Sequence, residues 1–152
     1  EVLLASRAFH AGMKALEPAM LKEVKPREGI IVIGTVAGDL HDIGKNLVVT
    51  FLRSFGYQVI DLGIDVQPED FVEAVIKNKA QVLGMSALLT TTMPAMGKTI
   101  ELLKEKGLRD KVKVVVGGGP ITKEYGEKIK ADGYGANAHE AVKVVERVLS
   151  MD

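Results

Sequence analysis

Cysteine is absent from this chain of 152 residues. Its absence excludes a disulfide framework, a cluster of thiolate metal ligands and a thiol nucleophile. Long apolar runs are missing too, since no stretch of about 18 consecutive apolar residues occurs. The amino terminus also lacks the pattern of a signal peptide. We therefore expect a cytoplasmic protein with no membrane partner.

An excess of charge of either sign is lacking as well, because 20 basic residues balance 20 acidic ones. The Lys-rich segments 22–27, 104–113 and 123–130 are interleaved with Glu and Asp. This mixture forms no basic patch of the kind that binds nucleic acid, so we expect no nucleic-acid partner. Histidine is scarce, and a phosphohydrolase metal site, which needs several His and Asp ligands, is disfavoured.

The apolar residues that the chain does contain, 47% of the total, are enough for one compact domain. Apolar runs predict strands at residues 30–36, 57–61, 82–86 and 112–116, with a weaker fifth near 133–134. Helical periodicity predicts helices at residues 45–55, 68–78, 93–106, 123–131 and 139–149. This alternation favours an α/β fold, a flavodoxin-like (Rossmann-like) parallel sheet of five strands in the order 2-1-3-4-5.

The amino-terminal segment has a different pattern from the rest. Residues 2–24 carry an amphipathic helical stripe that Pro18 interrupts, and residues 25–29 form a short polar linker. The chain begins at Glu1 and runs directly into this stripe, which predicts a piece of a longer chain. We expect a helix and linker over residues 1–27 and an α/β domain over residues 28–152.

Three unusual loops follow the first, third and fourth predicted strands. Parallel strands end at one edge of the sheet, and ligands bind there in open α/β folds. The candidate residues on these loops are Gly38, Asp39, Leu40, His41, Asp42, Ile43 and Gly44 after the first strand, Ser86, Leu88, Thr90 and Thr92 after the third, and Gly117, Gly118 and Gly119 after the fourth.

His41 has the sequence context of an oriented metal ligand. Asp39 lies two residues before it, close enough to accept a hydrogen bond from one imidazole nitrogen while the other points outward. Several alternatives remain open for the individual loops. His41 taken alone is more typical of a solvated histidine than of a metal ligand. The Ser/Thr run is equally typical of a turn and helix cap before Pro94, and the glycines are equally typical of a flexible turn.

Nucleotide-binding motifs fit this loop poorly. A Walker phosphate loop has four residues between its first glycine and Gly-Lys, followed by Ser or Thr. Here five residues separate Gly38 from Gly44, and Asn46 follows Lys45. No G-x-G-x-x-G fingerprint occurs in the first strand-to-helix turn either.

Taken together, the three loops resemble the cobalamin-binding module found in methionine synthase and in the corrinoid proteins of methanol, methylamine and methoxyarene methyltransferase systems. The residues that carry the resemblance are D-x-H-x-x-G (Asp39, His41, Gly44), S-x-L with a following Thr (Ser86, Leu88, Thr90), and a Gly-Gly pair within 117–119. The strings at residues 38–46 and 131–138 are most similar to the methyltransferase corrinoid proteins. The resemblance extends over almost the whole chain.

The resemblance implies a corrinoid, either cobalamin or a related cobamide, bound base-off with His41 as the lower ligand of cobalt. Asp39 would hold the imidazole, and the hydroxyl of Thr92 would extend this pair. A further hypothesis is that Asp39 takes up or releases a proton as His41 leaves or binds the metal.

The displaced nucleotide tail of the corrinoid would run past Ser86 and Thr90 and alongside the glycines at 117–119. Glycine is expected there because a Cβ would fill the slot that the tail needs. Tyr134 and Asn137 would close around the end of the tail.

The function that the resemblance implies is a methyl carrier that is not catalytic on its own. Its partners would be a substrate-specific methyltransferase, a second methyltransferase acting on folate or a thiol, and a reductive activator. Residues 1–27 would be the remnant of a helical cap domain. The alternatives are the cobalamin subunit of a radical mutase, a cobalamin-dependent sensor, and a cofactor-free receiver domain.

Overall fold

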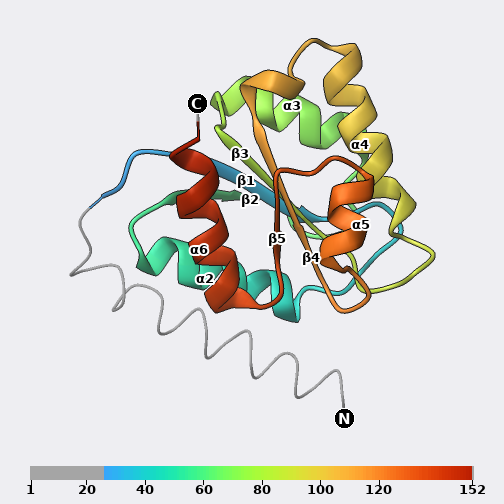
Figure 1. Ribbon diagram of the computed structural model, residues 1–152, viewed down its shortest axis with the longest axis horizontal. Helices are drawn as coiled ribbons and strands as arrows, with labels where there is room; N and C mark the ends of the chain where they lie inside the picture. The colour runs from blue at the N-terminus through green and yellow to red at the C-terminus, as the bar shows by residue number, and fades with distance from the viewer. Residues whose placement is uncertain (1–25, 152) are drawn as a thin grey trace.

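The computed structural model describes residues 26–151, which form a parallel sheet between two layers of helices (Figure 1). The strands are β1 (Ile30–Thr35), β2 (Gln58–Asp61), β3 (Val82–Ser86), β4 (Lys113–Gly117) and β5 (Gly133–Gly135). The helices are α2 (Ile43–Ser54), α3 (Pro68–Asn78), α4 (Pro94–Glu105), α5 (Lys123–Lys128) and α6 (Ala138–Leu149), with a short 3-10 helix at Arg109–Lys111. The strand order β2-β1-β3-β4-β5 confirms the predicted order.

The strand register brings the three predicted loops together. Thr35 at the end of β1 pairs with Ser86 of β3, and Ser86 pairs with Gly117 of β4. The next pair along joins Gly117 to Gly135 of β5. Four strands therefore end at the same level, so the loops that follow them lie side by side at one edge of the sheet.

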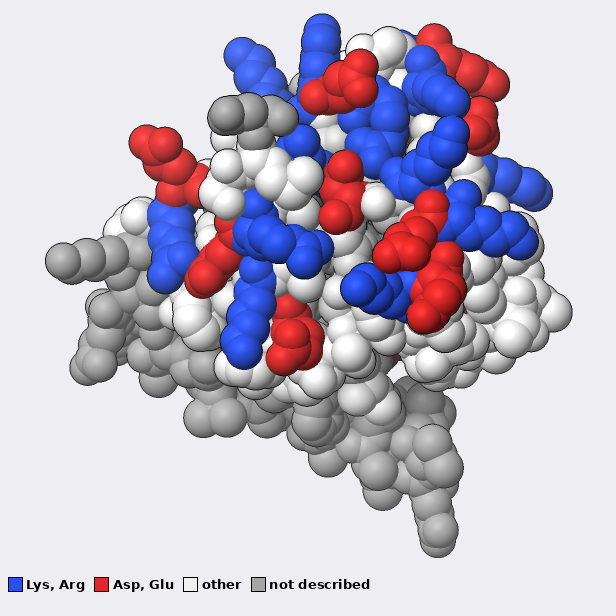
Figure 2. Space-filling view, viewed as in Figure 1, with Lys and Arg blue, Asp and Glu red and all other residues white. Residues whose placement is uncertain are grey.

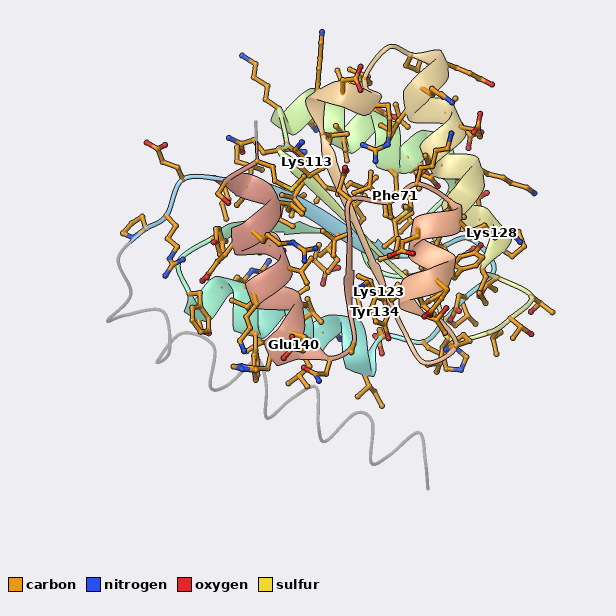
Figure 3. All side chains as sticks on the ribbon, viewed as in Figure 1. Phe71, Lys113, Lys123, Lys128, Tyr134 and Glu140 are labelled. Carbon is orange, nitrogen blue, oxygen red and sulfur yellow. The ribbon has the colours of Figure 1, made fainter. Side chains whose placement is uncertain are left out.

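Each face of the sheet has its own apolar core. Alternate residues of a strand point to opposite faces, so Ile33 packs with α2 and α6 while Val32 packs with α3, α4 and α5. Phe71 of α3 and Tyr134 of β5, both labelled in Figure 3, belong to this second core. Because the inner strand β1 is covered on both faces, its sequence is a continuous apolar run rather than an alternating one.

The first turn of α2 is the boundary that matters most for the site. This helix begins at Ile43, not at the predicted residue 45, so Ile43 and Gly44 are helical rather than part of the loop. Its first backbone bond runs from Asn46 N–H to the carbonyl of Asp42, with a donor–acceptor distance of 2.7 Å. The apolar stripe of α2 starts only at Leu47, which is why periodicity placed the start too late.

Other predicted boundaries shift by smaller amounts. Strand β4 occupies residues 113–117 instead of 112–116, because Gly117 pairs with both of its neighbouring strands. Helix α5 ends three residues earlier than predicted, before Lys130 adopts a positive φ of 63°. Pro68 and Pro94 occupy the first helical turns of α3 and α4, as predicted.

The helix predicted over residues 2–24 lies outside the described residues, and the division of the chain at residue 27 stays a prediction. Among the helices of residues 26–151, none is long and apolar enough to cross a membrane. In Figure 2, Lys and Arg side chains are interspersed with Asp and Glu over the upper part of the face in view, as the balanced composition predicts.

Candidate functional site

Asp39 and His41 form the centre of the site, on the loop between β1 and α2. Nδ1 of His41 lies 2.7 Å from Oδ1 of Asp39. The His41 side chain is 49% exposed while Asp39 is completely buried. The carboxylate favours the tautomer with its proton on Nδ1, and the structure shows no partner for Nε2 among residues 26–151. The imidazole therefore presents a nitrogen lone pair to the outside.

The Asp39 carboxylate is held by donors on both of its oxygens. Oδ1 also accepts the backbone N–H of His41 at 3.0 Å, and Oδ2 accepts the Leu88 N–H and the Thr92 hydroxyl, each at 2.7 Å. Burial on its own raises the pKa of Asp39, but hydrogen bonds from Leu88, Thr92 and His41 outweigh it and hold the pKa well below its usual range. Asp39 is therefore an ionised acceptor that fixes the imidazole.

The backbone of His41 is anchored separately from its ring. The hydroxyl of Thr35, at the buried end of β1, donates to the His41 carbonyl at 2.8 Å. The carbonyl, the backbone N–H and the ring nitrogen of one residue are thus each fixed by a buried side chain. This arrangement pre-orients His41 before any ligand arrives.

The Ser/Thr run after β3 does not cap the following helix. The residue that precedes α4 is Met93, and no side chain caps the helix start. The hydroxyl of Thr92 instead donates to Asp39, as the resemblance implied. Thr90 is exposed and lies outside the cavity described next. The structure thus connects the loop after β3 to the imidazole through Thr92.

A cavity of about 770 Å³ opens beside His41 and extends between α2 and α6 to the face of the sheet. We call it the His41 cavity. Its predicted lining residues are Leu40, His41, Asp42, Ile43, Gly44, Ser86, Leu88, Gly117, Gly118, Gly119, Tyr134 and Asn137. Its size is within the range of small-molecule and cofactor sites. Asp39 and Thr92 were also predicted but do not line the cavity; Asp39 accepts a hydrogen bond from the imidazole, and Thr92 donates one to Asp39. Gly38 is also outside the lining and lies in an exposed turn with a φ of 82°.

The floor of the His41 cavity was not predicted. It includes Ile33, Gly84 and Val115, which meet across β1, β3 and β4 on the face that α2 and α6 cover. Gly84 could have been predicted from the sequence, because glycine in the middle of a strand often marks a place where a ligand or another backbone segment approaches closely. The remaining unpredicted lining residues are Lys45, Leu47, Val48, Met85, Val116, Gly135, Ala136, Ala138 and Ala141.

Two glycines at the end of β4 are required for a reason that was not predicted. A Cβ on Gly118, whose φ is 126°, would lie 1.9 Å from the carbonyl oxygen of Ala87. A Cβ on Gly117 would lie 2.8 Å from the carbonyl oxygen of Gly135. Both residues are glycine because neighbouring backbone segments approach them closely, so the explanation based on a slot for the nucleotide tail is not needed for either.

Tyr134 and Asn137 border the His41 cavity but have structural roles of their own. The Tyr134 side chain packs with the core on the opposite face of the sheet. Asn137 caps α6, since its Oδ1 accepts the backbone N–H of Glu140 at 2.9 Å. The closure of Tyr134 and Asn137 around the nucleotide tail therefore stays a prediction.

Lys45 is buried in the cavity wall and is not available to a phosphate. Its Nζ lies 2.8 and 2.9 Å from the two carboxylate oxygens of Asp61 and 2.6 Å from Oδ1 of Asn46. These contacts engage the ammonium group on its own protein. They agree with the rejection of a phosphate loop and tie the first turn of α2 to the end of β2.

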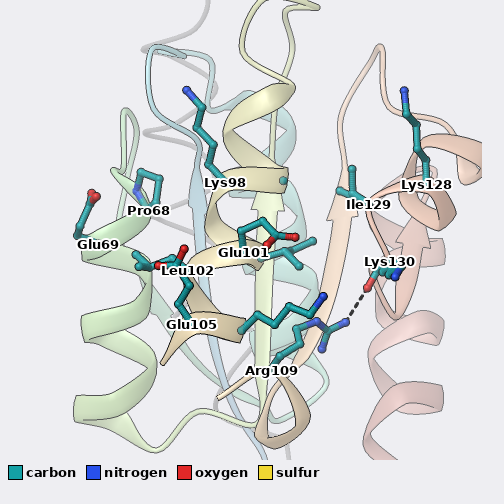
Figure 4. A pocket seen from close by; sticks show the side chains of 13 residues that line it. Pro68, Glu69, Lys98, Glu101, Leu102, Glu105, Arg109, Lys128, Ile129 and Lys130 are labelled. Carbon is teal, nitrogen blue, oxygen red and sulfur yellow. Dashed lines mark hydrogen bonds between the residues drawn. The ribbon is translucent and has the colours of Figure 1, made fainter. Parts of the chain in front are cut away.

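A second cavity, of about 660 Å³, lies on the opposite face between α3, α4 and α5 (Figure 4). We call it the Arg109 cavity. Arg109 donates to the carbonyl of Lys130 at 2.7 Å and forms an ion pair with Asp132 at 2.9 Å. Lys and Glu side chains make up most of the rest of its lining, and no predicted site residue is among them.

The described residues contain no group of three or more His, Cys, Asp or Glu that could hold a metal ion. A single outward-facing imidazole is a poor site for a bare ion, which needs several protein ligands. It suits a metal that arrives with its other ligands already in place. The site can thus add one axial nitrogen ligand to a preformed metal complex.

Comparisons with known proteins give one family. The family model described as "B12 binding domain" matches residues 29–143. Dimethylamine corrinoid protein 3 of Methanosarcina mazei is 47% identical over 150 residues, which cover 98% of this chain and 90% of that protein.

Two solved structures are similar in fold and in sequence. The Methanosarcina barkeri monomethylamine corrinoid protein has 39% identity and a TM-score of 0.84, over 97% of this chain and 70% of that chain. The methanol:cobalamin methyltransferase complex MtaBC of Methanosarcina barkeri has 33% identity and a TM-score of 0.77, over 99% of this chain and 57% of that chain.

Proposed function

Because this chain belongs to the B12-binding domain family, we propose that it binds a corrinoid base-off, with Nε2 of His41 as the lower ligand of cobalt. The observation that carries the proposal is the Asp39–His41 pair at the mouth of the His41 cavity, with Nδ1 and Oδ1 2.7 Å apart. The carboxylate fixes the ring and its tautomer, which leaves Nε2 free to bind metal. Cobalamin and related cobamides are equally suited to this pair.

The residues around His41 fit a corrinoid better than a bare metal ion. A corrin ring supplies four nitrogen ligands of its own, so the protein has to add only one. The cavity beside His41 has room for a displaced nucleotide tail, at about 770 Å³. The Ser86 hydroxyl lines this cavity and has no hydrogen-bond partner among residues 26–151, so it is free to bond to the tail.

Asp39 serves to orient His41. Both of its oxygens accept two hydrogen bonds, and its pKa is held below the usual range. Protonation of the carboxyl would cost at least one of these bonds. These hydrogen bonds support an orienting role for Asp39, while the hypothesis that Asp39 takes up a proton as His41 leaves the metal stays a prediction.

The function proposed for the chain is that of a methyl carrier. Bound cobalt supplies the nucleophile that accepts a methyl group and the bond that carries it. The relatives named as dimethylamine and monomethylamine corrinoid proteins favour this function over a radical mutase subunit or a sensor. The chain itself supplies the lower ligand and the tail cavity, and the reacting substrate is bound by a partner.

The partners follow from this role. We propose a substrate-specific methyltransferase, a second methyltransferase acting on folate or a thiol, and a reductive activator. The first is supported by the similarity to a methyltransferase complex. A cytoplasmic location and a helical cap remnant over residues 1–27 belong to the same proposal and stay predictions.

The test is to mix the protein with hydroxocobalamin, remove free ligand and record the visible spectrum of the wild type beside His41→Ala. We expect retained corrinoid in the wild type and loss of the spectral signature of a lower nitrogen ligand in the variant. His139→Ala is the matched control, since His139 is an exposed residue in the first turn of α6. Identical spectra for the wild type and His41→Ala would rule out His41 as the ligand.

A further inference from the structure

We propose that Asp65, on the loop between β2 and α3, is a positioning residue that holds the Asp39–His41 pair in its metal-binding geometry. The proposal rests on the proposed corrinoid function. Asp65 does not line the His41 cavity, and its contacts are with the backbone of the loop that carries His41. It would act only through that loop.

Two hydrogen bonds join Asp65 to the residues next to His41. The backbone N–H of Gly38 donates to Oδ1 of Asp65 at 2.7 Å. In the opposite direction, the backbone N–H of Asp65 donates to the carbonyl oxygen of Asp39 at 3.0 Å. Asp65 is therefore hydrogen-bonded to the backbone on both sides of the peptide bond between Gly38 and Asp39.

Further hydrogen bonds hold the β2–α3 loop against the end of β1 and so fix the position of Asp65. Thr35 N–H donates to the Gly63 carbonyl, and Val66 N–H donates to the Thr35 carbonyl, each at 2.9 Å. An isolated parallel bridge also pairs Val36 with Val66. The hydrogen bonding between β1 and β2 thus continues beyond the two strands, and Asp65 lies in the segment that it fixes.

The backbone of Asp65 is in an uncommon conformation. Its φ is 49°, one of three positive values among the described residues other than glycine. Asp and Asn are the side chains that adopt this region most readily after glycine, but it remains less favourable than the ordinary regions. A strained residue that also makes two specific contacts next to a site is a reason to infer a role in that site.

The contacts form a continuous path to the metal-binding atom. Asp65 fixes the backbone of Gly38 and Asp39, the Asp39 carboxylate fixes Nδ1 of His41, and the ring then directs Nε2. Without the Asp65 carboxylate, the Gly38 N–H would lose its acceptor and the loop would be held less firmly. We therefore expect His41 to bind cobalt less completely, even though no group that touches the cofactor has changed.

Two variants separate the carboxylate from the backbone conformation. Asp65→Gly keeps the positive φ without strain but removes the acceptor for Gly38. Asp65→Asn keeps an acceptor oxygen and a side chain that tolerates the same conformation. The matched control is Asp70→Ala, on the same segment in the first turn of α3.

The measurement is a titration of the 152-residue chain with methylcobalamin, followed by visible spectroscopy that distinguishes cobalt with and without a lower nitrogen ligand. Groups behind a metal ligand affect affinity by roughly 10–100-fold, and Asp65 is one contact further away, so we expect about a fivefold loss for Asp65→Gly. The fraction with a lower nitrogen ligand should fall with it. Asp65→Asn and Asp70→Ala should retain the wild-type spectrum.

The outcomes are distinguishable. If the wild type binds no corrinoid, or shows no lower nitrogen ligand, the proposed function fails. If the wild type shows that ligand and Asp65→Gly shows it equally, with unchanged affinity, the role of Asp65 is overturned. A loss in Asp65→Asn as large as that in Asp65→Gly would also overturn it. Urea unfolding of the apo variants detects any general loss of stability.

Discussion

The His41 cavity and the Arg109 cavity are similar in volume, about 770 and 660 Å³, but not in construction. The His41 cavity lies at the edge where four strands end in register, and the loops beside it are joined by hydrogen bonds to the buried carboxylate of Asp39. The Arg109 cavity lies between helices on the other face, and its lining is mostly long charged side chains. Volume alone therefore does not identify the site.

The two cavities differ in whether their polar side chains already have hydrogen-bond or ion-pair partners. At the His41 cavity, the Asp39 carboxylate is fully buried and engaged while the imidazole nitrogen Nε2 is left without a partner among the described residues. At the Arg109 cavity, the guanidinium is already engaged by Asp132 and by backbone carbonyls. A buried support with a free ligand atom is the arrangement that binds a metal complex.

The largest effect is expected from Gly118→Ala, which tests how the wall of the His41 cavity is built. The new Cβ would lie 1.9 Å from the carbonyl oxygen of Ala87, and the φ of 126° is unfavourable for any side chain. We expect a loss of about 3 kcal/mol in the free energy of unfolding, measured by urea denaturation.

Gly119→Ala is the matched control for this wall. Its Cβ would meet only the tip of the Leu88 side chain, at 3.1 Å. That side chain is flexible and 45% exposed, so it can move aside. Equal destabilisation by the two substitutions would contradict the close backbone approach as the reason for Gly118.

A smaller effect, on binding alone, is expected from Gly44→Leu. Gly44 lines the His41 cavity in the first turn of α2, and no atom lies within 4 Å of the position of its Cβ. The leucine would occupy cavity space and weaken corrinoid binding by about 2 kcal/mol, or about thirtyfold. The apo protein should keep its stability, because leucine is a better helix former than glycine.

Gly97→Leu makes the same change in the Arg109 cavity. Gly97 is also a helical glycine, and its Cβ would have a single neighbour, Ile129, at 3.9 Å. Corrinoid affinity, measured by equilibrium titration, should stay at the wild-type value. A comparable loss of affinity in this variant would mean that the two cavities had been assigned wrongly.

The smallest effect is expected from Thr92→Val, which removes one donor from Asp39. Because the pKa of Asp39 is lowered in the folded state, its ionised form stabilises the fold above about pH 4, and this contribution is lost as the pH falls through the folded pKa. The variant raises the folded pKa toward its ordinary value. We expect it to be about 1–2 kcal/mol less stable than the wild type at neutral pH.

The pH dependence of the stability difference tests this prediction. The stability difference between the wild type and Thr92→Val should shrink as acid protonates Asp39 in both proteins. Urea denaturation is measured at about pH 7 and at a pH below the folded pKa of Asp39, where the carboxyl is protonated in both proteins. Thr92→Ser keeps the hydroxyl and should behave like the wild type. A difference independent of pH would show that Thr92 acts by packing alone.

The order of strands and helices could be predicted from the sequence because it depends on local periodicity. The apolar run of β1 and the stripes of the helices are properties of neighbouring residues. The right-handed crossover rule then leaves few arrangements of a parallel sheet. Helix starts were less certain, as at Ile43, because the first turn of α2 has no side-chain cap to mark it.

The candidate site was predictable only in part. Asp39 and His41 are two residues apart, so their contact could be inferred from spacing, and the structure confirms it. The close backbone approaches at Gly117 and Gly118 were not predicted, because the atoms that exclude a Cβ come from Ala87 and Gly135. Backbone approaches between separate segments leave no pattern in a single sequence.

The sequence by itself determined the alternation of elements, the sheet edge where the unusual loops gather, and the histidine with its carboxylate. Only the tertiary structure decided what surrounds that pair. The donors from Leu88 and Thr92 reach Asp39 from 49 and 53 residues away. The hydrogen bond between Asp65 and Gly38 depends on the course of two separate loops. The position of Gly84 in the floor of the His41 cavity depends on strand register. Such contacts form through space, between residues whose distance is fixed only when the sheet has assembled.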